Sequence, residues 1–527
     1  MMRVGFASIY SWRPHVSMLH YLAGLARQAG HETYFLTCDG DLPNCYTREQ
    51  KPNRPAWLNC ALCRAGGVRS YESRNVASIG ALDGGDAAPA PRAREWVLSS
   101  ASTLGRFESD ADFAGAEFAG FADRLEPAAR RAYSAARRWI DANRLDAIVA
   151  FNGRMDATRA IFEAARDAQI RFVSQERSWF GDGVQLLPDE NCLGLRAVDK
   201  MIAAWRDRPL TRGQALRAAR HAAARFLRKN DKEWRAFNLE ATKASWPSAG
   251  AERRILLLPG SRNETWGHPD WLDQWPERTA AFDAIIARLK LRPEEVLLRC
   301  HPIWTEAVSG RSGALPERYY RDWAAKAGVR AIPSAARDST MDLIRAADAI
   351  VVAGGSAALE AGLLGKQVIA ASPSIYQRAG FQTTAYGPAD LAELALITTL
   401  PPPALRAERR RIRRLTLRFC FAAAYRLPQF VPFVEAATTT RYNYYFGADP
   451  WRLTRLLESG EVEADDPACA DDEAAEDAVL DMIEREEWAD IDAAAQNAPR
   501  GRTLKNDRRG LYRAVDRARE LMPRGDL

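Results

Sequence analysis

The sequence predicts an α/β protein with two Rossmann-like domains that face a cleft, a helical insertion and a C-terminal tail. Three observations lead to this expectation. The 527 residues exceed what one ordinary core holds. Short apolar runs alternate with segments of helical spacing, a pattern typical of parallel strands joined by helices. The alternation stops near residue 195 and restarts near residue 250, so it describes two domains rather than one.

The first domain is expected over residues 1–244 and opens with a β-α-β unit. Its first two strands are "RVGFASI" and "ETYFLTC", and the helix between them is "MLHYLAGLARQAG", which ends at Gly30. Residues 38–95 read as irregular, and residues 94–144 as mostly helical. The next strands are "LDAIVAF" and "IRFVSQERSW", separated by the helix "ATRAIFEAARDAQ". Residues 195–244 are predicted to form a basic helical insertion.

The second domain is expected over residues 250–400, after the linker "SWPSAGAE". Its strands alternate with helices and read "RRILLLPGS", "EEVLLRCHP", "VRAIPS", "AIVVAGG" and "KQVIAAS". Residues 401–460 are predicted to be helices that cross back to the first domain. Residues 461–527 are acidic and then basic, which favours a solvated and partly disordered tail.

Composition sets broad limits on location and partners. The chain begins in a strand pattern without the apolar core of a signal peptide, and no stretch reaches 18 consecutive apolar residues. The eight cysteines are expected to be reduced thiols, so we expect a cytoplasmic protein. The basic run at residues 406–418 lacks interleaved aromatics, which disfavours nucleic acid. It is expected to pack on the first domain or to touch the anionic inner face of a membrane, a peripheral contact.

A glycine pair marks the strongest candidate site. Gly354, Gly355 and Ser356 follow a buried strand and precede a helix, at the sheet edge where ligands bind in open parallel sheets. Glycines let a phosphate approach the backbone, and the serine hydroxyl can cap the helix or bond a phosphate oxygen. Glu360 lies one turn later and can accept ribose hydroxyls. The alternative is an ordinary turn with a helix-packing glycine.

Two further strand ends of the second domain carry polar groups. His301 follows the strand in "LLRCHP", where it could donate to a phosphate or a leaving group. Ser261 and Arg262 follow the strand in "LLLPGS", and a cation there would neutralise a diphosphate. We expect Ser261, Arg262 and His301 to join the glycine turn around one anion. A loop histidine on the surface is the alternative for His301.

The strand ends of the first domain predict the acceptor side of the cleft. Glu176 is the predicted base that deprotonates an acceptor hydroxyl, and Asp156 is the reserve. A structural salt bridge between Glu176 and a neighbouring arginine is the alternative. The remaining predicted acceptor-side residues are Arg13, His15, Asn152, Arg154 and Arg177.

Four cysteines gather in one loop-rich segment, at positions 38, 45, 60 and 63. The last two have the Cys-x-x-Cys spacing that suits a tetrahedral zinc ion. The sequence therefore favours a structural zinc site made by Cys38, Cys45, Cys60 and Cys63. Independent reduced thiols are nearly as well supported, and a redox role less so.

Two stretches of the second domain, "LLRCHP" and "AIVVAGGSAALEAGLLGKQVI", resemble the nucleotide-sugar domain of GT-B glycosyltransferases. The resemblance is strongest to bacterial capsule polysaccharide biosynthesis proteins, which include Kdo transferases. In that family the histidine and the hydroxyl-bearing turn contact the donor phosphate. The resemblance therefore implies phosphate contacts for His301 and Ser356 and a ribose contact for Glu360. The insertion at residues 195–244 has no counterpart in the family pattern.

These features together predict a glycosyltransferase that uses a nucleotide-sugar donor, CMP- or UDP-linked, and a surface polysaccharide or glycolipid precursor as acceptor. The charge that develops on the leaving phosphate would be stabilised by the helix after Ser356 and by His301, without a catalytic metal ion. A nucleotide-sugar 2-epimerase of the same architecture and a non-catalytic carbohydrate-assembly protein are the alternatives.

Overall fold

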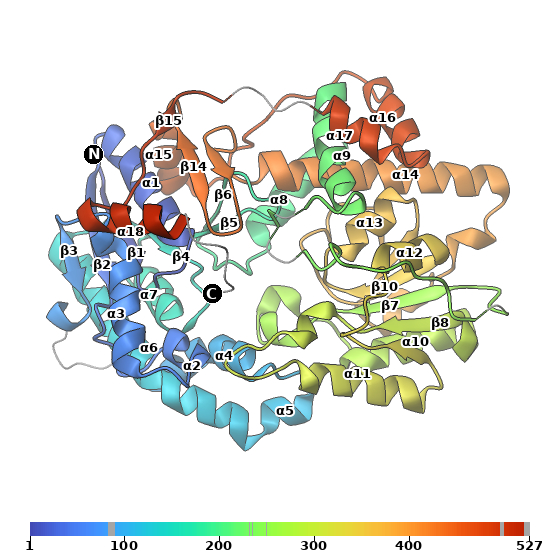
Figure 1. Ribbon diagram of the computed structural model, residues 1–527, viewed down its shortest axis with the longest axis horizontal. Coiled ribbons are helices and arrows are strands. Elements are labelled where there is room, and N and C mark those ends of the chain that lie inside the picture. Colours follow the sequence, from blue (N-terminus) through green and yellow to red (C-terminus); the bar gives the residue numbers. More distant parts are fainter. Residues whose placement is uncertain (83–89, 231, 234–235, 249, 496–499, 521–527) are drawn as a thin grey trace.

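The computed structural model describes residues 1–82, 90–230, 232–233, 236–248, 250–495 and 500–520. Two six-stranded sheets lie at opposite ends of the molecule, and both have the strand order of a Rossmann fold (Figure 1). The predicted α/β class with two Rossmann-like domains is confirmed. Within these ranges, we find no helix whose length and apolar character would let it cross a bilayer.

The first sheet has the order β3-β2-β1-β4-β5-β6. Its strands are β1 Arg3–Ser8, β2 Glu32–Thr37, β3 Val76–Ser78, β4 Ala147–Phe151, β5 Arg171–Arg177 and β6 Val184–Pro188, and only β6 is antiparallel to its neighbour. The main helices are α1 His15–Gln28, α4 Ala90–Gly105, α6 Ala116–Asn143 and α7 Asp156–Asp167. The segment predicted to be irregular also contains α2 Tyr46–Gln50 and α3 Ala56–Gly66. Asn59 is the one residue of α3 that is buried, so this helix has no buried apolar stripe from which it could have been predicted.

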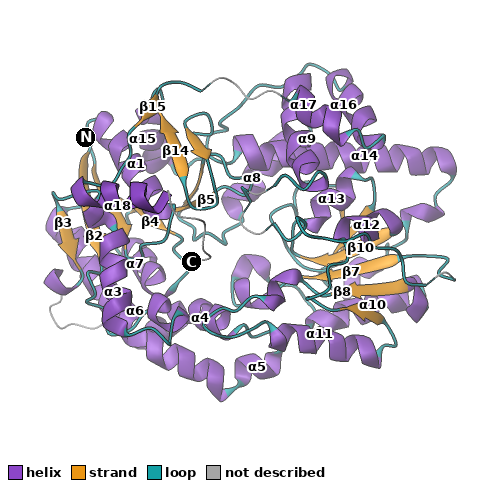
Figure 2. Cartoon of the chain, in the orientation of Figure 1, coloured by secondary structure: helices purple, strands orange, loops and turns teal. Residues whose placement is uncertain are grey.

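The second sheet is parallel and has the order β12-β11-β10-β7-β8-β9. Its strands are β7 Ile255–Pro259, β8 Val296–Arg299, β9 Arg330–Ile332, β10 Ala349–Ala353, β11 Gln367–Ala370 and β12 Gln382–Thr384. Successive residues face opposite cores: Leu256 packs with α12 Thr340–Ala346 and α13 Ala357–Leu363, whereas Leu257 packs with α10 Arg278–Leu289 and α11 Ala314–Lys326 (Figure 2). Both faces are therefore covered, as a parallel sheet requires.

The insertion and the tail form one helical layer beside the second domain. Its members are α8 Arg196–Trp205 and α9 Arg212–Phe226 from the insertion, α14 Pro402–Phe421, and α16 Ala474–Glu484 and α17 Trp488–Ala494 from the tail. The side chains of Leu480, Ile483 and Ile491 are buried in the same core as α9 and α14. This part of the tail is thus packed, contrary to the solvated extension that its acidic composition suggested. Residues 496–499 and 521–527 of the predicted disordered tail lie outside the described residues.

The chain returns to the first domain after α14. The helix α15 Pro450–Ser459 packs against α1, and a small antiparallel sheet forms from β13 Val434–Ala436, β14 Tyr442–Tyr445 and β15 Thr503–Leu504. A final helix, α18 Gly510–Glu520, lies over the first domain (Figure 1). The small sheet carries no recognisable sequence signal, because its strands are only two to four residues long.

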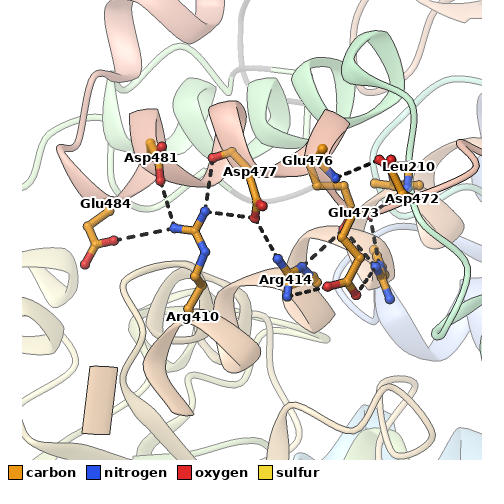
Figure 3. A network of polar contacts seen from close by, with 11 residues as sticks. Leu210, Arg410, Arg414, Asp472, Glu473, Glu476, Asp477, Asp481 and Glu484 are labelled. Atoms are coloured by element: carbon orange, nitrogen blue, oxygen red, sulfur yellow. Dashed lines mark hydrogen bonds and ion pairs between the residues drawn. The ribbon is translucent and has the colours of Figure 1, made fainter. Parts of the chain in front are cut away.

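A network of ion pairs joins the arginines of α14 to the carboxylates of the tail (Figure 3). Arg410 contacts Asp477 and Asp481, both at 2.8 Å, and Arg418 contacts Glu476 at 2.8 Å. Glu476 is completely buried and also accepts a hydrogen bond of 2.6 Å from the Leu210 N–H. These arginines are therefore occupied inside the protein. Residues 406–418 also pack on α9, which lies within the range predicted for the first domain, so that part of the expectation holds. The membrane contact stays a prediction.

The two domains touch through a buried carboxyl group. Glu108, which precedes α5 Asp110–Ala114, accepts hydrogen bonds from the Arg262 N–H at 2.9 Å and from the Tyr320 hydroxyl at 2.8 Å. Both donors belong to the second domain. Burial raises the pKa of Glu108 from its ordinary 4.5 to about 7, although the two hydrogen bonds oppose that shift.

The Glu108 contact predicts a pH-dependent stability. Between pH 4.5 and pH 7 the folded chain keeps this proton whereas the unfolded chain releases it, so the free energy of unfolding falls as pH rises. The expected slope from this group is about 1.4 kcal/mol per pH unit. Urea unfolding at pH 5, 6 and 7 gives the free energy of unfolding at each pH. Its decrease with pH should be smaller in Glu108→Gln than in the parent. The same slope in Glu108→Gln as in the parent would contradict the prediction, and the exposed Glu294→Gln serves as control.

Candidate functional site

A cavity of about 420 Å³ lies at the carboxyl edge of the second sheet. Its lining includes Gly260 after β7, His301 after β8, and the turn 354–356 after β10. The strands β7 and β10 are neighbours at the point where the strand order reverses, which is where open α/β sheets bind ligands. The volume is in the range of small-molecule sites.

The backbone conformation of the turn at residues 354–356 requires glycine at its first two positions. Gly354 and Gly355 have φ angles of +74° and +96°, which residues with a Cβ rarely adopt. A Cβ on Gly355 would meet nothing within 4 Å, so its surroundings are open. The Ser356 side chain makes no capping hydrogen bond to α13 and lines the cavity. The turn is thus a bend with accessible backbone, and its glycines are not needed to pack a helix.

His301 enters the cavity as a neutral donor. Burial lowers the pKa of His301 to about 4, and nearby arginines add to that effect. Its Nδ1 accepts a hydrogen bond of 3.1 Å from the Ile303 N–H, so the proton of the neutral ring is on Nε2. The ring of Phe237 stands edge-on to it, with centroids 6.0 Å apart. The histidine is therefore fixed in one tautomer by the backbone that follows it.

The insertion supplies a wall of the cavity, which the sequence did not predict. Arg225, Asn230, Phe237 and Asn238 all line it, and they come from the end of α9 and the following loop. Arg299 lines it as well, buried at the end of β8, with its Nε unpartnered among the described residues. Arg299 directly precedes the Cys-His pair at the strand end, so its place beside the cavity could have been predicted from the sequence. The residues of the insertion carry no such sequence signal.

Ser261 and Arg262 are not in this cavity, which corrects their predicted role. The Ser261 hydroxyl accepts a hydrogen bond of 2.9 Å from the Trp304 indole. The Arg262 guanidinium contacts Asp110 at 2.5 Å and lies over Phe113, both in the first domain. Beyond Gly260 the loop after β7 turns toward the first domain, so Arg262 contributes to the interface between the domains.

A second cluster forms in the first domain, where four predicted residues meet. The Glu176 carboxylate lies 3.3 Å from His15 Nε2 and accepts hydrogen bonds from the Asn152 amide at 3.2 Å and the Arg177 N–H at 3.0 Å. Burial lowers the pKa of His15 to about 4, although Glu176 opposes the shift. Neutral donors thus hold a partly exposed carboxylate at the ends of β4 and β5.

Three other predicted residues of this domain have structural roles. Asp156 is completely buried, where Tyr10 and the Tyr46 N–H donate to its two oxygens, so its prediction as a reserve base is wrong. Burial raises its pKa to about 6. Arg154 bonds Ser99 and Thr103 of α4 and reaches the Glu264 carbonyl of the second domain. Arg13 pairs with Asp516 of α18 at 2.6 Å.

The four cysteines line one small cavity of about 30 Å³. The Cys60 sulfur accepts hydrogen bonds from the Arg48 guanidinium at 2.9 and 3.3 Å, and burial raises the pKa of the Cys38, Cys45 and Cys63 thiols. Zinc requires thiolates. Among the residues that the structure describes, no group of three or more His, Cys, Asp or Glu side chains could hold a metal ion. The predicted zinc site is therefore not supported, and these are free thiols.

Solved structures with a similar arrangement include transferases and epimerases of nucleotide sugars. Thermosulfurimonas dismutans KpsC, a beta Kdo 2,4 transferase, is 15% identical; the match covers 59% of this chain and 87% of that one, with a TM-score of 0.32. The Methanocaldococcus jannaschii UDP-GlcNAc 2-epimerase, solved with UDP-GlcNAc and UDP, is 10% identical over 87% and 99% of the two chains, with a TM-score of 0.29. Streptomyces sp. SF2575 glycosyltransferase SsfS6, solved with thymidine diphosphate, is 13% identical over 80% and 96%, with a TM-score of 0.23.

Neither a family model nor a curated protein sequence matches the chain. At these identities and TM-scores, the solved structures do not assign a reaction to this chain.

Proposed function

We propose that the protein is a glycosyltransferase that moves a sugar from a nucleotide-sugar donor to a glycan or lipid-linked glycan acceptor of the surface-polysaccharide type. The observation that supports it most is the 420 Å³ cavity where β7, β8 and β10 end beside the glycine turn and His301. A nucleotide diphosphate fits such a site because its charge can be met by backbone N–H groups and by a neutral imidazole donor.

The Glu176 cluster would supply the acceptor side. The carboxylate takes the proton of the acceptor hydroxyl, whose oxygen forms a bond to the anomeric carbon. The bond from that carbon to the phosphate oxygen breaks, and its electron pair stays on the phosphate. His301 Nε2–H donates a hydrogen bond to the phosphate as this charge develops. His15 and Asn152 hold Glu176 in position throughout.

Donor recognition is the direct test of this function. Thermal unfolding with CMP-, UDP-, GDP- and dTDP-sugars should show a Tm increase for one donor, with CMP- and UDP-linked sugars the first choices. No increase with any of them would overturn the proposal. Incubating the active donor without acceptor separates the epimerase alternative, because an epimerase converts the sugar alone whereas a transferase leaves it mostly intact.

Replacing His301 should reduce turnover through the leaving phosphate. For His301→Ala we expect kcat to fall about 100-fold, the usual effect of losing one such donor. Because the pKa of His301 is about 4, the parent rate should not change between pH 5.5 and 8 through this group. His268→Ala is the matched control, since His268 Nδ1 accepts from the Asp270 N–H in the same way outside the cavity. Equal effects of both variants on kcat would contradict the role of His301.

A further inference from the structure

Arg225 links the insertion to the donor-site helix α13 through a buried ion pair. Its Nη1 lies 2.9 Å from Glu360 Oε1, and its Nε lies 2.9 and 3.1 Å from the two oxygens of Glu233. The side chains of Arg225 and Glu360 are each only 6% exposed. The Arg225 guanidinium thus pairs with two carboxylates in the wall of the cavity. Arg225 lies in the last turn of α9.

Only one of the two carboxylate oxygens of Glu360 has a hydrogen-bond partner in this arrangement. Its Oε1 accepts from Arg225, but its buried Oε2 has no hydrogen-bond partner among the described residues. Burial raises the pKa of Glu360, and Arg225 opposes that shift and favours the ionised form. A buried carboxylate oxygen without a donor is costly, so a ligand that brings a hydroxyl to it gains the missing hydrogen bond.

Helix α9 holds Arg225 in place through its own packing. Thr211 and Gln214 form a capping box at the start of the helix, and α14, α16 and α17 pack along it. Arg220, on the same helix, pairs with Asp492 of α17 at 3.2 Å. The carboxylate of Glu360 is therefore oriented by a cation whose position is set outside the Rossmann-like domain.

We propose that Arg225 is a positioning residue that presents Glu360 to the ribose of the donor, so that the site selects ribonucleotide-linked sugars over 2′-deoxyribonucleotide-linked ones. This rests on the proposed function, because it requires that the cavity binds a nucleotide. Arg225 keeps Oε1 occupied and leaves Oε2 as the acceptor for a ribose hydroxyl. Glu360 lines the cavity together with the glycine turn and His301.

The test compares affinities for ribonucleotides and their 2′-deoxy counterparts. Isothermal titration with UDP and 2′-deoxy-UDP, CMP and 2′-deoxy-CMP, and GDP and 2′-deoxy-GDP should show a ribose preference of about 10-fold or more for the bound base in the parent protein. In Arg225→Met this preference should fall below about 3-fold, mainly through weaker ribonucleotide binding. Arg225→Lys, which keeps the charge, should restore part of it.

Two controls separate positioning from folding. Arg220→Met removes another cation of α9 without touching the cavity, so its ribose preference should equal that of the parent. If Arg225→Met does not fold, Glu360→Gln carries the same comparison, and a preference that stays at the parent value would overturn the inference. Equal loss for both sugars in Arg225→Met, or no ribose preference in the parent, would also overturn it. Failure of every nucleotide to bind the parent would instead overturn the proposed function.

Discussion

Replacing Gly355 with valine should strongly weaken nucleotide binding while leaving the fold intact. The φ angle of +96° at this residue disfavours any side chain with a Cβ, and a β-branched one most of all. Because the space around Gly355 is open, the strain is relieved by a change of the turn, not by repacking of the core. We expect nucleotide affinity to fall at least about 10-fold, which corresponds to about 1.4 kcal/mol.

The measurement is nucleotide titration together with circular dichroism and the Tm of the unliganded protein. Gly310→Val is the matched control, because Gly310 has a φ of +73°, equally open surroundings and a place outside the cavity. Both variants should lose a similar amount of stability, and only Gly355→Val should lose affinity. Retained affinity in Gly355→Val would reduce the glycine turn to a simple connection between β10 and α13.

Neutralising Glu476 should destabilise the protein more than neutralising a surface carboxylate of the tail. Its carboxylate is completely buried between Arg418, at 2.8 Å, and Arg414, at 3.3 Å, and the Arg418 side chain is only 4% exposed. Removing one member of a buried network leaves uncompensated charge, which costs about 3–5 kcal/mol. Denaturant unfolding of Glu476→Gln should therefore show a loss of about 3 kcal/mol or more.

A surface partner of the same network provides the comparison. Glu484 pairs with Arg413 at 3.3 Å, but half of its side chain is exposed, so Glu484→Gln should cost no more than about 1 kcal/mol. Similar losses in Glu476→Gln and Glu484→Gln would mean that burial does not strengthen the network. Salt screens buried ion pairs little, so the stability difference between the parent and Glu476→Gln should persist at high salt. Disappearance of that difference at high salt would also mean that burial does not strengthen the network.

Strand positions were predictable because apolar runs of parallel strands are local signals. All nine strands read from the sequence are present, and the chain order of their ends placed His301 and the glycine turn at one edge. A strand end locates the backbone but not the direction of the loop beyond it. Ser261 and Arg262 therefore turned out to face the first domain, whereas Gly260, directly before them, lines the cavity.

Charged segments were harder to interpret, because the energy of a charge depends on a partner far away in the sequence. Without knowledge of a distant partner, a run of like charges is expected to face solvent. The acidic tail and the arginines of α14 are therefore predicted to be exposed. In the structure they satisfy each other, as Arg418 and Glu476 show. The same reason hid Arg225, whose partner Glu360 is 135 residues away. Asp156 was misread for a related reason, since nothing local revealed that Tyr10 and Tyr46 would enclose it.

The helical layer also has a consequence for biosynthesis. A chain leaves the ribosome from its N-terminus, so both Rossmann-like sheets emerge before α16 and α17 exist. Until then the arginines of α14 lack their carboxylates, and α9 lacks the helices that support Arg225. An interrupted chain would therefore carry every strand of the second sheet, while the helix that supplies Arg225 to the cavity wall would still lack its supporting helices. The wall of the cavity would therefore reach its final packing only after the last segment has folded against α9 and α14.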